Sequence, residues 1–321
     1  LSKRVVGEAL DGTRIDSVNK NYTIGHVVDE KVDRIIRLVA TPAEENGGVG
    51  IDRIMEYNTD INVDQVEIPI FVDIYQVRSE VWPNATSSSF KIQLNSQYIR
   101  EGMKFKMETL SGAATDFTWA EDIVVDSISY YANNNLNDYD YYAEITWKRS
   151  NGETFTPTTN PAANDSVFFK SERVLNFDNL TSGAGGITKK NTVTGINIID
   201  DMLFWTDNYS EPKKINITRS KLGTQKYYLT EGQGGLSVNF TGQCAIGTKQ
   251  VEVPAHEVHT ALVVKDINSP TKTFFPPGAY TKVLDLNGST TTAIKEEHIT
   301  VIRKSPTMPP TIEAFKTSVV K

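Results

Sequence analysis

The most informative stretch of the sequence reads GINIIDDMLFWTD and occupies residues 195–207. An alternating first part, GINII, and an apolar second part, MLFWT, flank the dipeptide Asp200-Asp201. This pattern predicts two strands joined by a tight turn. The alternating segment KKINIT at residues 213–218 predicts a third strand. Three antiparallel strands within about 25 residues, separated by short turns, are typical of one blade of a β-propeller.

Five residues at the end of this stretch form the candidate blade motif: Leu203, Phe204, Trp205, Thr206 and Asp207. Leu203, Phe204 and Trp205 are expected in the core of the blade. The Asp207 carboxylate is expected to fix the following turn by accepting backbone N–H groups, as Asp side chains do in turns. All of these roles are structural, and no catalytic residue is predicted.

The motif resembles the YWTD type of propeller blade, with Phe204-Trp205-Thr206-Asp207 in place of Tyr-Trp-Thr-Asp. The longer string from Thr194 to Ile215 resembles large virion structural proteins of tailed bacteriophages. These include tail or muzzle components of crAss-like phages and structural proteins of marine phages. The segment EHITVIRKSP at residues 297–306 is similar to the same group. The resemblance implies a virion protein of the phage tail or portal-proximal region, and it says little about residues 60–156.

The chain is expected to be mostly β and to contain several modules. Residues 1–65 are interpreted as an N-terminal β segment with possible blades, and 66–156 as a small antiparallel β-module, inserted or adjacent. Residues 157–304 hold the YWTD-like propeller region, and 305–321 a Pro-rich linker into a further module. One blade motif is clear, whereas a closed propeller needs several repeats of about 40–45 residues. The expected fold is therefore a degenerate or partial β-propeller, and a lone three-stranded meander is the alternative.

Short apolar or alternating segments mark the strands of the predicted β-module. They lie at residues 68–75, 90–94, 103–107, 123–128 and 141–147. In the third of these segments, side chains on a strand would alternate between two faces. Met103, Phe105 and Met107 would then share one face, and Lys104 and Lys106 the other.

The composition argues against several classes of protein. The 321 residues carry 33 Lys+Arg and 40 Asp+Glu, which gives a net charge of -7. Because nucleic-acid coating needs a basic face, we expect at most passage of DNA without specific binding. No apolar run approaches the roughly 20 residues of a membrane span. Cys244, the only cysteine, cannot form an internal disulfide and is expected to be a buried structural thiol.

Three polar or glycine-rich motifs suggest chemistry but have simpler explanations. His256 and His259 in HEVH are three residues apart, whereas a zincin helix needs a spacing of four, and on a strand they would face opposite ways. The acidic segment 137–140 has oxygen donors for Ca²⁺ but lacks the EF-hand spacing. The segment 232–235 lacks the Gly-Lys-Ser/Thr ending of a phosphate loop. No metal and no cofactor is expected.

The sequence therefore predicts a non-enzymatic structural component of a tailed-phage virion, in its tail, muzzle or hub. Its partners would be other virion proteins and copies of itself in a homo-oligomeric ring, joined through exposed β edges. The alternative is a propeller module that binds a host surface or glycan, with Tyr130-Tyr131 and Tyr139–Tyr142 as stacking residues. A metal-dependent hydrolase around His256 and His259 is the third hypothesis.

Overall fold

The computed structural model describes residues 21–43, 46–58, 67–82, 85–86, 88–132, 141–177, 180–183, 186–189, 193–207, 210–232, 235–239, 250–265, 280–282 and 294–301. These residues form mainly antiparallel strands and one α-helix, which confirms the predicted mostly-β class. Within these ranges, no helix has the length and hydrophobicity needed to cross a bilayer.

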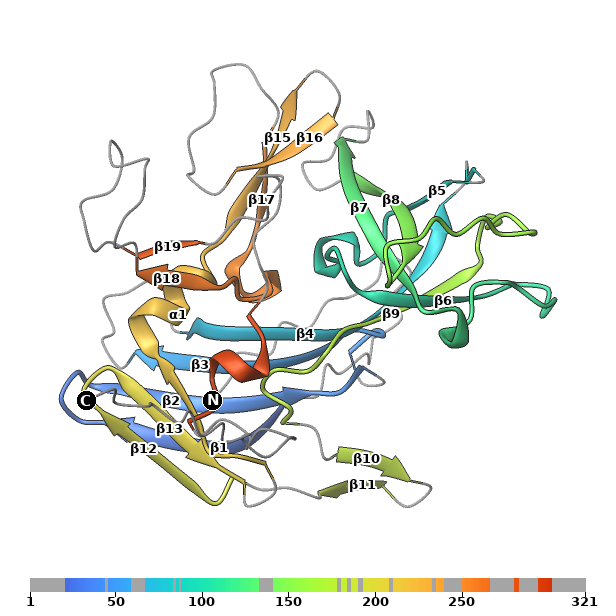
Figure 1. Cartoon of the computed structure of the whole chain (residues 1–321). Coiled ribbons are helices and arrows are strands. Elements are labelled where there is room, and N and C mark those ends of the chain that lie inside the picture. The colour runs from blue at the N-terminus through green and yellow to red at the C-terminus, as the bar shows by residue number, and fades with distance from the viewer. Residues whose placement is uncertain are drawn as a thin grey trace, which may run out of the picture.

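Most strands belong to one 12-stranded antiparallel sheet, shown in Figure 1. Its strands are β1 (Tyr22–Asp29), β2 (Arg34–Thr41), β3 (Gly50–Asn58), β4 (Glu67–Trp82), β5 (Ser89–Ile92), β6 (Lys104–Glu108), β7 (Ile123–Ala132), β8 (Tyr141–Arg149), β9 (Ser166–Lys170), β15 (Tyr227–Gly232), β16 (Gly235–Asn239) and β17 (Gln250–Val253). Strands β1 to β4 pair in sequence order and form an open sheet. The second half of β4 then leaves this open sheet and enters a barrel.

Strand β4 belongs to both parts, and its sequence shows why. From Ile70 to Tyr75 every side chain is buried, because other segments cover both faces of this half. Farther along, burial alternates: Val77 and Val81 are buried, whereas Arg78 and Trp82 are exposed. An alternating strand with one solvated face is suited to a barrel wall.

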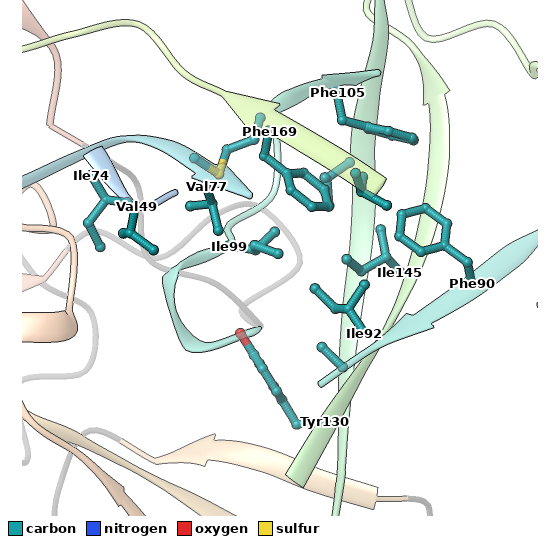
Figure 2. Close-up of a cluster of buried hydrophobic side chains, with 14 of the residues drawn as sticks. Val49, Ile74, Val77, Phe90, Ile92, Ile99, Phe105, Tyr130, Ile145 and Phe169 are labelled. Carbon is teal, nitrogen blue, oxygen red and sulfur yellow. The ribbon is translucent and has the colours of Figure 1, made fainter. Parts of the chain in front are cut away.

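The barrel is a closed ring in the order β4–β5–β8–β7–β6–β9, since β9 pairs with both β6 and β4. Strands β6 and β7 share little pairing, and the backbone bond from Val125 N to Met103 O, at 2.9 Å, helps to close the ring there. Aromatic rings fill the interior: the Phe105 centroid lies 5.6 Å from the centroids of both Phe90 and Phe169. Figure 2 shows these three side chains within one buried apolar cluster.

The predicted blade stretch forms a separate three-stranded sheet of β12 (Gly195–Ile199), β13 (Met202–Thr206) and β14 (Lys213–Asn216). This meander packs on the β1–β4 sheet, where Leu203 joins a buried cluster with Ile36 and Leu38. Its third strand is shorter than predicted, because helix α1 (Ile217–Gly223) begins directly after it. Asn216 caps that helix by accepting a 2.8 Å hydrogen bond from the backbone N–H of Arg219.

The remaining elements are small. Strands β15, β16 and β17 continue from the barrel through the pairing of Leu236 with Tyr130. Two hairpins, β10 (Leu180–Gly183) with β11 (Gly186–Lys189) and β18 (Val263–Lys265) with β19 (Tyr280–Lys282), form separate sheets. Four 3-10 turns are η2 (Ser96–Tyr98), η3 (Trp119–Glu121), η4 (Ala255–Glu257) and η5 (Glu296–His298).

The mostly-β class is confirmed, but a propeller is not. The β12–β14 meander has the short turns of a blade, but the residues that the structure describes do not form a ring of blades. The predicted module boundaries at residues 65, 156 and 304 stay predictions. Strand β9, which completes the barrel, lies beyond residue 156, and residues 1–20 and 302–321 lie outside the described ranges.

Candidate functional site

The five residues of the candidate blade motif lie on and just after β13. Leu203 is fully buried and Trp205 is 5% exposed, so both point toward the β1–β4 sheet. Phe204 alternates with them and is only half-buried on the other face. The carbonyl of Thr206 accepts a 2.8 Å hydrogen bond from the Thr194 N–H. Asp207 follows the strand.

The Asp207 carboxylate contacts the turn that follows it. Its Oδ1 accepts a hydrogen bond of 2.8 Å from the Ser210 backbone N–H and one of 3.2 Å from the Ser210 hydroxyl. These contacts hold the chain between β13 and β14, which pair along Trp205 and Lys213. The motif therefore shapes a meander; it does not assemble reactive groups.

The two histidines of the HEVH segment occupy different environments. The His256 side chain is 52% exposed and lies 3.6 Å from Glu257, on η4. The His259 side chain is 6% exposed, and its Nδ1 accepts a 3.1 Å hydrogen bond from the Ile74 N–H. Among the described residues, no three His, Cys, Asp or Glu side chains are placed to hold a metal ion together.

The other motifs singled out from the sequence are described only in part. Cys244, the acidic segment 137–140 and residues 233–234 lie outside the described ranges. Of the tyrosines proposed for stacking on sugars, Tyr130 is buried in the barrel core, and Tyr131 and Tyr142 stack on each other with centroids 5.3 Å apart.

The structure instead contains a buried polar cluster that sequence analysis missed. It is formed by Asp52, Asp73, Arg100, Arg173 and His259, and we call it the latch cluster. Asp52 and Asp73 are fully buried and directly opposite each other on β3 and β4. An Asp in the middle of each apolar strand, GIDRI and IFVDIY, is the signal that could have drawn attention to it.

The two carboxylates of the latch cluster hold the segment that follows the barrel. Asp73 Oδ2 accepts hydrogen bonds from the backbone N–H groups of Val174 and Leu175, at 2.7 and 2.8 Å. Asp52 Oδ2 accepts one from the Phe177 N–H at 2.9 Å and pairs with the Arg173 guanidinium at 2.7 Å. The chain leaving β9 is thus fixed onto β3 and β4 by buried bonds, which are costly to break.

A second segment is held on β4 by both side-chain and backbone hydrogen bonds. The Thr260 Oγ1 accepts a 2.8 Å hydrogen bond from the Val72 N–H, and the Thr260 N–H donates to the Val72 carbonyl at 2.9 Å. With the bond from Ile74 to His259, these contacts fix the chain after η4 to the same strand. Strand β4 is therefore the element on which the barrel, the open sheet and both connecting segments meet.

Burial dominates the electrostatics of the latch cluster. It raises the pKa of Asp52 to about 6, although the Arg173 charge acts in the opposite direction. It also raises the pKa of Asp73, against the N–H bonds from Leu175 and Val174. Burial, and then the Arg100 charge, lowers the pKa of His259 well below its ordinary value. His259 is therefore neutral, and its 3.9 Å approach to Asp73 is not an ion pair.

Two buried carboxylate oxygens of the latch cluster, Asp52 Oδ1 and Asp73 Oδ1, have no hydrogen-bond partner among the described residues. Because Asp52 already pairs with Arg173, the cluster does not present two bare carboxylates to a cation. Asp73 also takes two N–H bonds. The latch cluster therefore fixes the backbone of the segment after β9 rigidly onto β3 and β4. Because the Asp52 and Asp73 carboxyl groups titrate, the stability of this attachment depends on pH.

A groove of about 860 Å³ lies between the open sheet, α1 and β17. Charged side chains in its walls form ion pairs with each other: Arg37 with Glu67, and Lys226 with Glu252. A second hollow of about 670 Å³ is acidic and is lined by Glu172, Glu211, Lys295, Glu296, Glu297, His298 and Thr300. Neither places a nucleophile beside a base in the way that nucleophilic catalysis requires.

Comparison with known proteins adds no assignment. No protein-family model matches this chain, and no curated protein matches it.

Proposed function

We propose that this chain is a non-enzymatic structural component of a tailed-phage virion, located in the tail, muzzle or hub. The observation that carries the proposal is the resemblance of residues 194–215 and 297–306 to virion structural proteins of tailed phages. In the structure these two segments meet, because the Lys214 N–H donates to the Ile299 carbonyl at 2.7 Å and the Val301 N–H donates to the Pro212 carbonyl at 2.8 Å. The resemblance therefore covers one connected part of the fold.

A scaffold role also agrees with how the parts are joined. The latch cluster, the shared strand β4 and the closed barrel are all devices that fix modules relative to each other. A subunit that must hold its shape under load within a particle needs such fixed joints. Rigid elements also position an interface at lower entropic cost than mobile ones.

The proposal includes a partial propeller. The four consecutive strands β1–β4 and the three strands β12–β14 are both antiparallel meanders of blade size. They pack face to face through a common core that contains Ile36, Leu38, Leu203 and Trp205. Successive propeller blades pack in this manner, so the two sheets are interpreted as two adjacent blade-like units.

The test is cryo-electron microscopy of purified phage particles from the source of the chain, with the described fold fitted into the density. We expect copies of the fold in a symmetric ring at the tail or portal-proximal vertex. Density at the tip of a fibre would favour the alternative, a module that binds a host surface or glycan. Absence of the chain from particles, checked by mass spectrometry, would refute the virion assignment.

A further inference from the structure

The outer wall of the barrel carries cations stacked on aromatic rings. The register places Arg78 of β4 beside Phe168 of β9, Phe168 beside Lys106 of β6, and Lys170 beside Lys104. The Arg78 guanidinium and the Lys106 ammonium lie 5.5 and 4.9 Å from the centroid of the Phe168 ring. With Trp119 of η3, these residues form a surface that we call the barrel face.

Two cations of the barrel face have no carboxylate partner among the described residues. Lys104 pairs with Asp122 and Lys106 with Glu108, whereas the charged groups of Arg78 and Lys170 lie over aromatic rings. The Lys170 ammonium lies 5.1 Å from the ring of Trp119, which is 37% exposed. Because the rings hold these cations in place, less side-chain freedom is lost when a carboxylate binds them. Exposed Trp and Arg are also enriched at protein–protein interfaces.

A second surface combines aliphatic side chains with carboxylates, and we call it the acidic tip. It is formed by the β1–β2 hairpin and the β12–β13 turn, and its residues are Val28, Glu30, Val32, Asp33, Ile199, Asp200 and Asp201. The three aliphatic side chains are 55, 55 and 56% exposed, in chain order. Lys31 is the only cation within residues 28–33 and 199–201.

Both turns of the acidic tip lie at one end of the molecule, on the left of Figure 1. The Asp201 carbonyl accepts a 2.8 Å hydrogen bond from the N–H of Ile217, the first residue of α1. Lys221 of the same helix pairs with Glu56 of β3 at 2.6 Å. In the register of β2 and β3, Glu56 lies opposite Ile36, which is near the hairpin end of β2.

The register places the acidic tip and the barrel face at opposite ends of the shared strand. Arg34, at the hairpin end of β2, lies opposite Asn58 of β3, and the preceding residue, Tyr57, lies opposite Glu67, where β4 begins. The barrel face starts near the other end of β4, at Arg78. The same chain therefore presents the acidic tip at one end of the shared strand and the barrel face at the other. Figure 1 shows the corresponding strands, β1–β2 and the barrel, on opposite sides of the molecule.

We propose that the acidic tip of one copy of this chain binds the barrel face of the next copy. The carboxylates of the tip would pair with Arg78 and Lys170, and Val28, Val32 and Ile199 would cover the exposed Trp119. A net charge of -7 opposes association of copies in general, so contact requires a local region of opposite sign. A contact between two different surfaces of one chain is head-to-tail and builds rings or filaments. This inference rests on the proposed function, since it names the subunit contact of such an assembly.

The test uses two complementary double variants of the whole chain. The barrel-face variant Arg78→Glu/Lys170→Glu turns the unpaired cations into acids. The tip variant Glu30→Lys/Ile199→Lys adds cations and avoids Asp33 and Asp200, whose left-handed backbone (φ 48° and 55°) would strain a lysine. A matched control, Lys226→Glu/Lys295→Glu, reverses two exposed cations that belong to neither surface. Circular dichroism melting checks that every variant is folded.

Self-association is measured by sedimentation velocity across protein concentration, at low and high salt. We expect the wild type and the control to associate, more weakly at high salt, and either double variant to lose about 100-fold or more in association constant. Mixing the two variants should restore assembly, because the acidic barrel face then meets a cationic tip and the other contact is wild-type. A folding defect cannot produce that rescue.

Other outcomes would overturn the inference. A wild type that stays monomeric at all concentrations contradicts it, as does association that neither variant weakens. Binding of the barrel face to single-stranded DNA or to an acidic polysaccharide, with no self-association, would assign this surface to a polyanion instead. Failure of the proposed function is distinguishable: the chain would then be absent from particles while the head-to-tail contact still formed in solution.

Discussion

Replacing Arg173 by Met tests whether the latch cluster holds the fold together. Arg173 pairs with the fully buried Asp52 at 2.7 Å, and its guanidinium carbon lies 3.6 Å from the centroid of the Tyr75 ring. Met keeps the length and apolar stem of the side chain but removes both interactions. The Asp52 carboxylate would then be buried beside Asp73 without its cation.

The expected magnitude follows from burial and depends on pH. Removing one partner of a buried ion pair costs about 3–5 kcal/mol, and Arg173 is 21% exposed, so we expect about 3 kcal/mol at pH values well above the Asp52 pKa. Below that pKa, which burial raises to about 6, Asp52 is protonated in both proteins. The variant should then lose only the stacking on Tyr75, about 1 kcal/mol.

Urea denaturation monitored by tryptophan fluorescence, at mildly alkaline and mildly acidic pH, measures both values. The matched control is Arg149→Met, because Arg149 also has a carboxylate partner, Glu121, and lies over a ring, Phe155, but at a more exposed site. Its loss should be about 1 kcal/mol or less and should vary little with pH. An Arg173→Met loss that equals the control, or is the same at both pH values, would refute the role given to the latch cluster.

Three further predictions concern stability. Burial raises the pKa of Asp52 in the folded state to about 6, above its ordinary value of 3.8. The stability of the wild type relative to Asp52→Asn should therefore rise as pH falls through about 6, which parallel denaturation series of the two proteins would measure. Phe105→Ala should lower the free energy of unfolding by about 3–5 kcal/mol in urea denaturation, because Phe105 is fully buried inside the barrel. Phe168→Ala, on the outer wall of the barrel, should lower it much less. Equal losses of stability would contradict the assignment of Phe105 to the barrel interior. Asp207→Ala should cost about 1 kcal/mol by thermal denaturation, since the Ser210 N–H loses its acceptor, and an unchanged melting temperature would count against that contact.

Local patterns predict the strands of this chain better than their partners. Alternation in residues 103–107 correctly places Phe105 inside the barrel and Lys104 outside. The same pattern does not show that β6 pairs with β9, because that contact joins segments about 60 residues apart and depends on the packing of the whole ring. The meander of residues 195–216 could be predicted because its strands pair with their neighbours along the chain.

The latch cluster could not be predicted from the sequence, for a related reason. Asp52 and Asp73 lie on different strands, and Arg173 and His259 come from connecting segments far along the chain. Single polar residues in apolar strands indicate that some buried partner exists, but they do not identify it. Phe204 is a smaller case: alternation along a strand already places it on the face away from Leu203 and Trp205, and the structure adds that this face is only half-buried.

The continuity of β4 has a mechanical consequence. At about 3.3 Å per residue, its 16 residues form a rod of roughly 50 Å that enters the barrel wall without a loop or hinge. A pulling force applied to the barrel along this direction would reach β3 as shear, spread over the many hydrogen bonds between the two strands. Such bonds must break together, whereas bonds pulled at one end open one at a time. A subunit built in this way would transmit strain along its length instead of bending at the joint between its modules.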